Sequence, residues 1–289
     1  MTHAHIGSAS MQATNWSKLG LGTGTLASFG RSASFSEVDR LVSAMVDLGV
    51  TVIDTADSYG SSDCERLLGK VLRGKRQSFT VATKAGYRLS NLPSPLHPLN
   101  QFVKKGFQHF GFHQCFTPAY LAKSIDNSLS RLGVEHLDAF LLHNPPLKVV
   151  EDDHVLQFCR NLIDSGKTIL TGLSSENPEV ISAAIASGVF KIIQTPASLK
   201  AAVTMRQFWK ECEMNGIHVI GNHVFDPACF TVQGMTHETL MRSSTALLPN
   251  RATILCGTRN TAHLRQAFEW ASTPLSEADA ERELQRILQ

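Results

Sequence analysis

Short apolar segments alternate with longer segments of helical periodicity through most of the chain. The short segments are apolar at consecutive positions, which is typical of strands buried on both faces. Eight strands are predicted, at residues 18–23, 51–54, 80–84, 137–143, 169–174, 191–194, 217–221 and 253–257. Amphipathic helices are predicted at residues 35–48, 118–132, 155–165, 178–187, 205–215 and 262–270.

A glycine closes most of the predicted helices and is followed by an apolar segment, as a short helix-to-strand loop requires. Eight strands alternating with helices in 289 residues predict a single-domain (β/α)8 barrel of the α/β class. The alternative fold is a doubly wound sheet, which usually carries GxGxxG after its first strand. Residues 20–24, GLGTG, lack the third glycine at the required offset and are interpreted as a close-packed barrel strand.

The chain is expected to divide into a flexible N-terminal segment at 1–16, the barrel at 17–271 and a C-terminal helical tail at 272–289. Residues 1–16 lack the apolar core of a signal peptide, and no later stretch approaches the ~20 apolar residues that span a bilayer. We therefore expect neither secretion nor membrane insertion.

Charge and cysteine content narrow the classes of function. There are 27 Lys and Arg against 25 Asp and Glu, a net charge of +2, which gives no footprint for nucleic acid or an anionic membrane. Six cysteines form no CxxC pair, so neither a zinc ribbon nor a redox dithiol is predicted, and no metal site is expected. Sparse cysteines suit a reducing cytoplasm, where we expect the protein to reside.

Polar residues stand where the predicted strands end. In a (β/α)8 barrel the chemistry lies at the carboxyl ends of the strands. Polar groups at the ends of apolar strands are costly unless paired, so a convergence of such residues on one rim predicts a functional pocket. The strand-end residues are Asp54, Lys84, His143, Ser174, Gln194, Asn222 or His223, and Gly257.

Four ionisable residues among or beside these ends form a candidate catalytic set. Asp54 ends the second strand, and Tyr59 lies in the loop that follows it. Lys84 ends the third strand and His143 ends the fourth. Each alone has a structural explanation, since a strand-end Asp caps helices and a Lys reaches solvent. Their occurrence together, on successive strand ends, favours chemistry over structure.

Three further segments carry a family resemblance: LGLGT at 19–23, SLSRLGVEHLDAFLLH at 128–143 and TGLS at 171–174. With the four ionisable residues, they make the sequence resemble the aldo-keto reductases, as a divergent member, over roughly residues 18–270. Those proteins are NAD(P)H-dependent carbonyl reductases on a (β/α)8 barrel, with a catalytic Asp, Tyr, Lys and His. The matching residues here are Asp54, Tyr59, Lys84 and His143.

The resemblance implies reduction of an aldehyde or ketone to an alcohol, with Tyr59 as the general acid. A tyrosine has a reference pKa near ~10, so it needs a group that stabilises its phenolate. The Lys84 ammonium would do so, and Asp54 would hold Lys84 in place. His143 would form a hydrogen bond with the substrate oxygen or share in the proton relay, and the cofactor would carry the hydride.

The resemblance also implies where the cofactor binds. Ser174 and Gln194 match residues that hold the nicotinamide amide, whereas Ser175 stands where the family has Asn. Asn222 or His223 stands where the family stacks a tyrosine on the nicotinamide.

A second group of residues matches the family's adenosine site. Gly257, Thr258 and Arg259 resemble the site for the adenosine 2′-phosphate, which favours NADP(H) over NAD. Gln266 and Ala267 replace a Glu-Asn pair that reaches the adenine, so a weaker contact with the adenine is expected.

A long segment at 88–116 separates the third strand from its helix and contains five phenylalanines. Such loops over a barrel mouth shape substrate pockets, so the substrate is expected to be a small-molecule carbonyl compound, bulky or apolar. The alternative is contact with a partner subunit, and the oligomeric state stays open.

The departures at Ser175, Asn222 and Ala267 leave two alternative functions. One is a lyase or isomerase that uses the same four residues without net redox. The other is a regulatory barrel that senses NADP(H).

Overall fold

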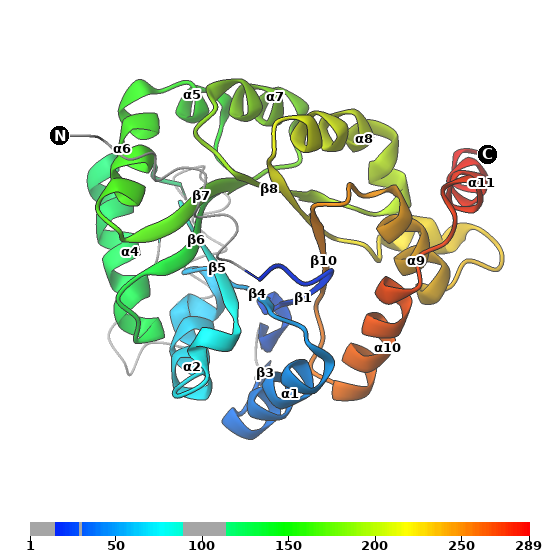
Figure 1. Cartoon of the computed structure of the whole chain (residues 1–289), viewed down its shortest axis with the longest axis horizontal. Coiled ribbons are helices and arrows are strands. Elements are labelled where there is room, and N and C mark those ends of the chain that lie inside the picture. Colours follow the sequence, from blue (N-terminus) through cyan, green and yellow to red (C-terminus); the bar gives the residue numbers. More distant parts are fainter. Residues whose placement is uncertain (1–14, 29–30, 89–113) are drawn as a thin grey trace.

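The computed structural model describes residues 15–28, 31–88 and 114–289. Eight parallel strands close into a barrel in the order β1, β10, β9, β8, β7, β6, β5, β4 (Figure 1), which confirms the expected single-domain (β/α)8 barrel. The strands are β1 Leu19–Gly22, β4 Val52–Asp54, β5 Thr80–Ala85, β6 Leu137–His143, β7 Thr168–Ser174, β8 Ile192–Pro196, β9 His218–Asn222 and β10 Ala252–Cys256. A small ribbon pairs β2 Ala27–Ser28 with β3 Arg31–Ser32.

Helices form a ring around the strands (Figure 1). They are α1 Phe35–Leu48, α2 Asp63–Val71, α4 Pro118–Leu132, α5 Leu147–Val150, α6 Asp153–Asp164, α7 Pro178–Ser187, α8 Leu199–Met214, α9 His237–Leu247, α10 Thr261–Ser272 and α11 Glu277–Leu288. The 3-10 turns are η1 Gly24–Leu26, η2 Tyr59–Ser62, η3 Arg76–Ser78 and η5 Pro227–Thr231. α11 packs against α8 and α9. The division at residues 17 and 271 stays a prediction. Within the described ranges, no helix is long and apolar enough to cross a membrane.

Helices α2 and α9 and the short α5 were not predicted from the sequence, and α8 begins at Leu199, six residues before its predicted start at 205. The buried faces of α2 and α9 include polar residues, among them Glu65 in α2 and Ser243 and Ser244 in α9. A polar residue on the buried face weakens the apolar stripe by which a helix is recognised. The hydrophobic pattern therefore does not predict these helices, because buried polar residues interrupt their apolar faces.

Lys84 and Gln194 do not end their strands, which corrects the expectation for both. β5 continues to Ala85, which pairs with Leu142, and β8 continues to Pro196, which pairs with Asn222. The end of an apolar segment was interpreted as the end of a strand, but backbone pairing continues past it. Lys84 and Gln194 are consequently each only 1% exposed.

A small apolar cluster fills the inside of the barrel. Its members come from six strands, and Trp16, just before β1, packs against it. The Trp16 ring also lies 4.3 Å from the ring of His218 at the first residue of β9. This packing closes the amino-terminal end of the barrel and leaves the carboxyl ends of the strands for polar residues.

α2 and α4 approach each other closely at Gly69, where a Cβ atom would lie 2.3 Å from the Arg131 carbonyl oxygen. Alanine normally favours a helix by about 1 kcal/mol over glycine. Here we expect the opposite sign, because the methyl group meets backbone and the helices must separate. Gly69→Ala should lower the free energy of unfolding by about 1–3 kcal/mol, measured by urea denaturation. Ser130→Ala, at an exposed position of α4, is the control and should stay near the wild type.

Candidate active site

A buried ion pair links two neighbouring strands of the barrel. The Nζ atom of Lys84 in β5 lies 2.6 Å from Oδ1 of Asp54 in β4, and it also donates to the Thr55 carbonyl at 2.8 Å. Asp54 is 3% exposed and Lys84 is 1% exposed. Charges this deeply buried persist only when they are paired and hydrogen-bonded, which both are.

The surroundings of Lys84 keep it charged. Burial is the largest influence on the Lys84 pKa and lowers it, but Asp54 and Tyr59 together raise it by more, so the pKa lies above its ordinary value. Lys84 is therefore an ammonium at neutral pH.

Tyr59 lies beside this ammonium, with Lys84 Nζ 5.2 Å from its ring centroid. The charge of Lys84 is the largest influence on the Tyr59 pKa and lowers it, as the sequence analysis expected. Burial and the charge of Asp54 outweigh it, so the net Tyr59 pKa lies above its ordinary value. At neutral pH Tyr59 is a protonated phenol beside a cation that would stabilise its phenolate.

The turn after β4 holds Tyr59 in place. In η2, Gly60, Ser61 and Ser62 all have left-handed backbone conformations, with φ of 57°, 56° and 78°. A Cβ atom on Gly60 would lie 2.3 Å from the Cβ of Ala27, so only glycine fits there. The Ser62 hydroxyl donates to the Asp57 carbonyl at 2.9 Å and closes the turn.

His143 ends β6, and its ring lies 6.0 Å from that of Tyr59 at an interplanar angle of 81°. The barrel register places His143 opposite Ser174, and Ser174 opposite Gln194. The structure thus brings together the four candidate catalytic residues and the first group of cofactor candidates. A cavity of about 170 Å³, the central cavity below, is lined by Tyr59, His143, Asn144, Ser174, Ser175, Glu176, Gln194, Pro196, Asn222 and His223.

The structure gives the hydrogen-bonding state of three cofactor candidates at the central cavity, Gln194, Ser175 and Asn222. Gln194 Nε2 donates to Asp54 Oδ1 at 3.0 Å, so Gln194 contacts the catalytic candidates as well as the cavity. The Ser175 hydroxyl accepts from the Asn177 backbone at 3.1 Å. The Asn222 Oδ1 atom is buried and accepts no hydrogen bond from the described part of the chain.

The remaining cofactor candidates lie apart from the central cavity. Gly257, Thr258 and Gln266 line a second cavity, of about 300 Å³, together with aromatic and imidazole side chains of Phe225, His237, His263 and Trp270. Gly257 directly follows β10 and does not end it, which corrects the expected strand end.

Arg259 does not line this second cavity. Its Nη2 atom lies 3.4 Å from both carboxylate oxygens of Glu37 in α1. Two hydrogen bonds from Ser34, and then the charge of Arg259, hold the Glu37 pKa below its ordinary value. Arg259, two residues before α10, therefore lies against a charged carboxylate.

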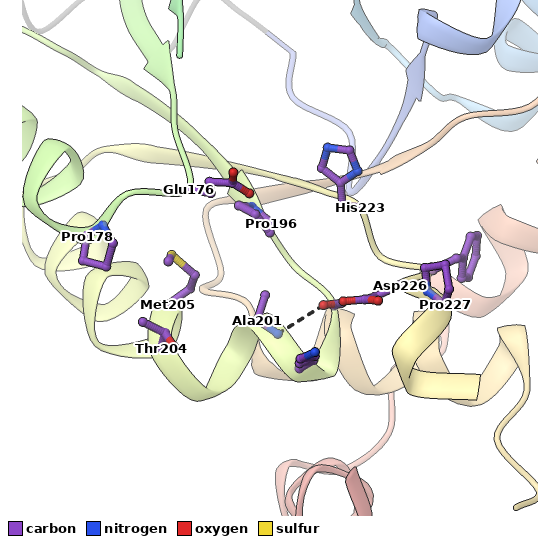
Figure 2. Close-up of a pocket in the computed structure, with 12 residues that line it drawn as sticks. Glu176, Pro178, Pro196, Ala201, Thr204, Met205, His223, Asp226 and Pro227 are labelled. Carbon is purple, nitrogen blue, oxygen red and sulfur yellow. Dashed lines mark hydrogen bonds between the residues drawn. The ribbon is translucent and has the colours of Figure 1, made fainter. Parts of the chain in front are cut away.

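A third cavity, of about 590 Å³, adjoins the central cavity and shares Glu176, Pro196 and His223 with it. Figure 2 shows Met205 and Ala201 on α8, across from the loops that carry Glu176 and Asp226. The Ala201 backbone donates to the Ser198 hydroxyl at 3.1 Å at the start of this helix. The sequence analysis missed this cavity, because its lining comes mostly from loop and helix residues that follow the strand ends.

Comparison with known proteins decides the family. The sequence model of the "Aldo/keto reductase family" matches residues 18–242, which is more than half of the chain. The chain belongs to the aldo/keto reductase family. The match includes the four candidate catalytic residues and ends inside α9, so Gly257, Thr258, Arg259 and Gln266 lie beyond it.

Named relatives of this aldo/keto reductase family member include two bacterial proteins. "Aldo-keto reductase YhdN" of Bacillus subtilis is 30% identical over 190 residues, 63% of this chain and 50% of that protein. "Pyridoxal 4-dehydrogenase" of Microbacterium luteolum is 33% identical over 134 residues, 44% of this chain and 39% of that protein. The chain spans about half the length, or less, of the curated relatives it matches.

Solved structures of the family share the fold. An aldo-keto reductase of Klebsiella pneumoniae in complex with NADP and acetate aligns with a TM-score of 0.68 at 18% identity, over 94% of this chain and 91% of that one. The holo form of an aldo-keto reductase of Bacillus halodurans aligns with a TM-score of 0.70 at 19% identity, over 94% and 92% of the two chains. Both have the barrel architecture found here.

Three residues around His143 in this aldo/keto reductase were not predicted from the sequence. The Tyr87 ring packs against the His143 ring, Gln114 donates to the His143 carbonyl, and Asn144 follows His143 in the chain. Tyr87 follows β5 by two residues and Asn144 follows β6 directly, so a survey of the positions just past each strand end would have found both. Gln114 had no such signal, because it lies at the far end of the long segment. Residues 89–113 of that segment, on which the expectation of a substrate-shaping loop rests, lie outside the described residues.

Proposed function

We propose that this protein is an NADP(H)-dependent oxidoreductase that reduces an aldehyde or ketone to an alcohol. The observation that carries the proposal is the buried Asp54–Lys84 pair, with Nζ–Oδ1 at 2.6 Å, beside a protonated Tyr59. An ion pair that only stabilised the fold would not require a tyrosine beside it at the wall of a cavity. Family membership and the reductase and dehydrogenase names of the relatives support the same reaction.

The proton path follows from these contacts. Tyr59 donates its phenolic proton to the carbonyl oxygen as the C–O bond becomes single. The resulting phenolate faces the Lys84 ammonium, which offsets its charge, while Asp54 keeps that ammonium in place. His143, at the same cavity, would donate a hydrogen bond that orients the carbonyl oxygen. NADPH, when bound, supplies the hydride to the carbonyl carbon.

The residues at the central cavity fit a nicotinamide. A buried acceptor without a donor costs free energy, so Asn222 Oδ1 favours a ligand that brings an N–H group. A carboxamide NH₂ is such a donor, and the Ser174 hydroxyl and Gln194 amide line the same cavity. Ser175 and His223 complete the wall. Asn222 would thus bind the carboxamide by a hydrogen bond, in place of the stacking ring that the family resemblance implies.

The second cavity suits the adenosine end of the cofactor. Its lining combines Gly257, Thr258 and Gln266 with the flat side chains of Trp270 and His263, against which a purine can pack. Arg259, just before α10, would hold the 2′-phosphate and exchange its contact with Glu37 for one with the ligand. Relatives from Klebsiella pneumoniae were crystallised with NADP and with NADPH.

Arg259→Ala tests this assignment. The substitution should weaken NADPH by roughly 10- to 150-fold, since a charge-assisted hydrogen bond contributes about 1.5–3 kcal/mol. NADH lacks the 2′-phosphate and should be affected far less. Both dissociation constants are measured by quenching of protein fluorescence. Arg265→Ala, in α10, is the matched control, because the ion pair that Arg265 forms with Asp47 is exposed. Equal losses for NADPH and NADH would contradict the assignment.

Titration with NADPH followed by a panel of aldehydes and ketones tests the function itself. Binding together with carbonyl-dependent NADPH oxidation supports the proposal. Tight binding without oxidation across the panel favours the NADP(H)-sensing alternative, and no binding favours the lyase or isomerase. A bulky or apolar carbonyl substrate and a cytoplasmic location remain part of the proposal and are not tested by this experiment.

A further inference from the structure

Two short segments pair at the base of the long segment between β5 and α4. We call residues 86–87 and 114–116 the neck. Tyr87 and Gln114 form an antiparallel bridge, and the Cys115 backbone donates to the Gly86 carbonyl at 2.8 Å. Gly86 has φ of 138°, and a Cβ atom on it would lie 2.3 Å from the ring of Phe116. The neck is therefore a closely packed structure and not a loose connection.

The neck contacts both the side chain and the backbone of His143 at the end of β6. The ring of Tyr87 lies 4.7 Å from the ring of His143 at an interplanar angle of 87°, an edge-to-face arrangement. Gln114 Nε2 donates to the Asn144 carbonyl at 2.8 Å and to the His143 carbonyl at 3.3 Å. Asn144 Nδ2 donates in turn to the Tyr87 hydroxyl at 3.3 Å.

The backbone after His143 needs this support. Asn144 has φ of 52°, a left-handed conformation that costs free energy in a residue other than glycine. The Gln114 amide donates to the carbonyl groups of His143 and Asn144, which lie on either side of the Asn144 Cα atom. The neck thus contacts the two features that set the position of the imidazole, its ring plane and the course of its backbone.

We propose that Tyr87 and Gln114 are positioning residues for His143. The inference rests on the proposed function, in which His143 orients the carbonyl oxygen. A hydrogen bond to a reacting oxygen requires a donor placed within about 0.5 Å and 10–20°. Tyr87 fixes the plane of the ring, and Gln114 fixes the turn that carries it. Tyr120 supports the neck from α4, because its hydroxyl donates to the Tyr87 carbonyl at 2.8 Å.

The experiment compares Tyr87→Leu, Tyr87→Phe and Gln114→Ala in the full chain. Tyr87→Leu removes the aromatic edge and should lower kcat for carbonyl reduction roughly 10- to 100-fold, with a much smaller change in KM. Tyr87→Phe keeps the ring and loses only the hydroxyl, so it should retain most of the activity. Gln114→Ala should fall between them. NADPH affinity should be unchanged in all three, since the contacts of the neck described above go to the end of β6 and to α4.

A second measurement follows His143 directly. Two-dimensional NMR of the imidazole nitrogens, with the His143 signals assigned by their loss in His143→Asn, should show altered chemical shifts in Tyr87→Leu. Gln157→Ala is the matched control, because the Gln157 amide donates to Asn161 on an exposed face of α6. This control should leave the His143 signals unchanged.

The outcomes separate the two proposals. If the wild type reduces no carbonyl, the proposed function fails, and the NMR data alone decide whether Tyr87 positions His143. If the wild type is active, the positioning role requires both the loss of kcat and the change at His143 in Tyr87→Leu. Either change without the other overturns the role, and so does a Tyr87→Phe variant as impaired as Tyr87→Leu.

Discussion

Tyr59→Phe is expected to lower kcat/KM for carbonyl reduction by roughly 10²–10⁴-fold, the contribution of a positioned general acid. The substitution removes the proton that would be transferred and keeps the ring at the cavity wall. Burial and Asp54 hold the Tyr59 pKa above its ordinary value, so the wild-type enzyme carries this proton throughout the neutral range. NADPH affinity should stay close to the wild-type value. Steady-state kinetics and a fluorescence titration measure the two quantities.

Gln157→Ala provides the control for Tyr59→Phe, because Gln157 lies on an exposed face of α6 and its amide donates to Asn161. Its kcat/KM should remain within a few-fold of the wild type. A Tyr59→Phe variant that keeps its kcat/KM would show that another group supplies the proton. A large loss of NADPH affinity would instead assign Tyr59 to the cofactor site.

Lys84→Met is expected to lower the free energy of unfolding by about 3–5 kcal/mol, because it leaves the Asp54 carboxylate buried without its cation. Among the side chains that the structure describes, Asp54 would keep only the Gln194 amide as a partner, at 3.0 Å. The folded-state pKa of Lys84 lies above its ordinary value, so the pair stabilises the protein fully at neutral pH. That stabilisation is lost only as the pH rises through the raised pKa. Urea denaturation at pH 7 therefore measures the whole effect.

Lys167→Met is the control for this substitution. Lys167 and Asp126 also form an ion pair, but their side chains are 40% and 57% exposed. An exposed pair contributes about 0–1 kcal/mol, so Lys167→Met should change little. The double variant Lys84→Met/Asp54→Leu should recover part of the stability, because it removes the unpaired carboxylate as well. If Lys84→Met unfolds like the wild type, the ion pair does not contribute to stability.

The hydrophobic pattern of the chain predicts the barrel well, because strands of a parallel sheet are buried on both faces and are therefore continuous apolar segments in the sequence. All eight expected strands overlap those of the structure, and helices α1, α4 and α7 have the expected bounds. The errors fall where local pattern and tertiary environment disagree. Glu65 is a charged residue on the buried face of α2, where the Arg131 side chain of α4 binds it at 2.6 Å. No window of sequence around Glu65 contains that partner.

The candidate site divides in the same way. The sequence by itself determined which residue types stand at or next to the carboxyl ends of the strands. Asp54, Lys84 and His143 recur with the spacing of the strands, and the barrel brings them together. Only the tertiary structure decided what each one touches. It paired Arg259 with Glu37 across 222 residues and turned Gln194 toward Asp54. It also placed Tyr87 and Gln114 against His143. Such contacts depend on side-chain geometry between distant segments, and periodicity along one segment carries no information about them.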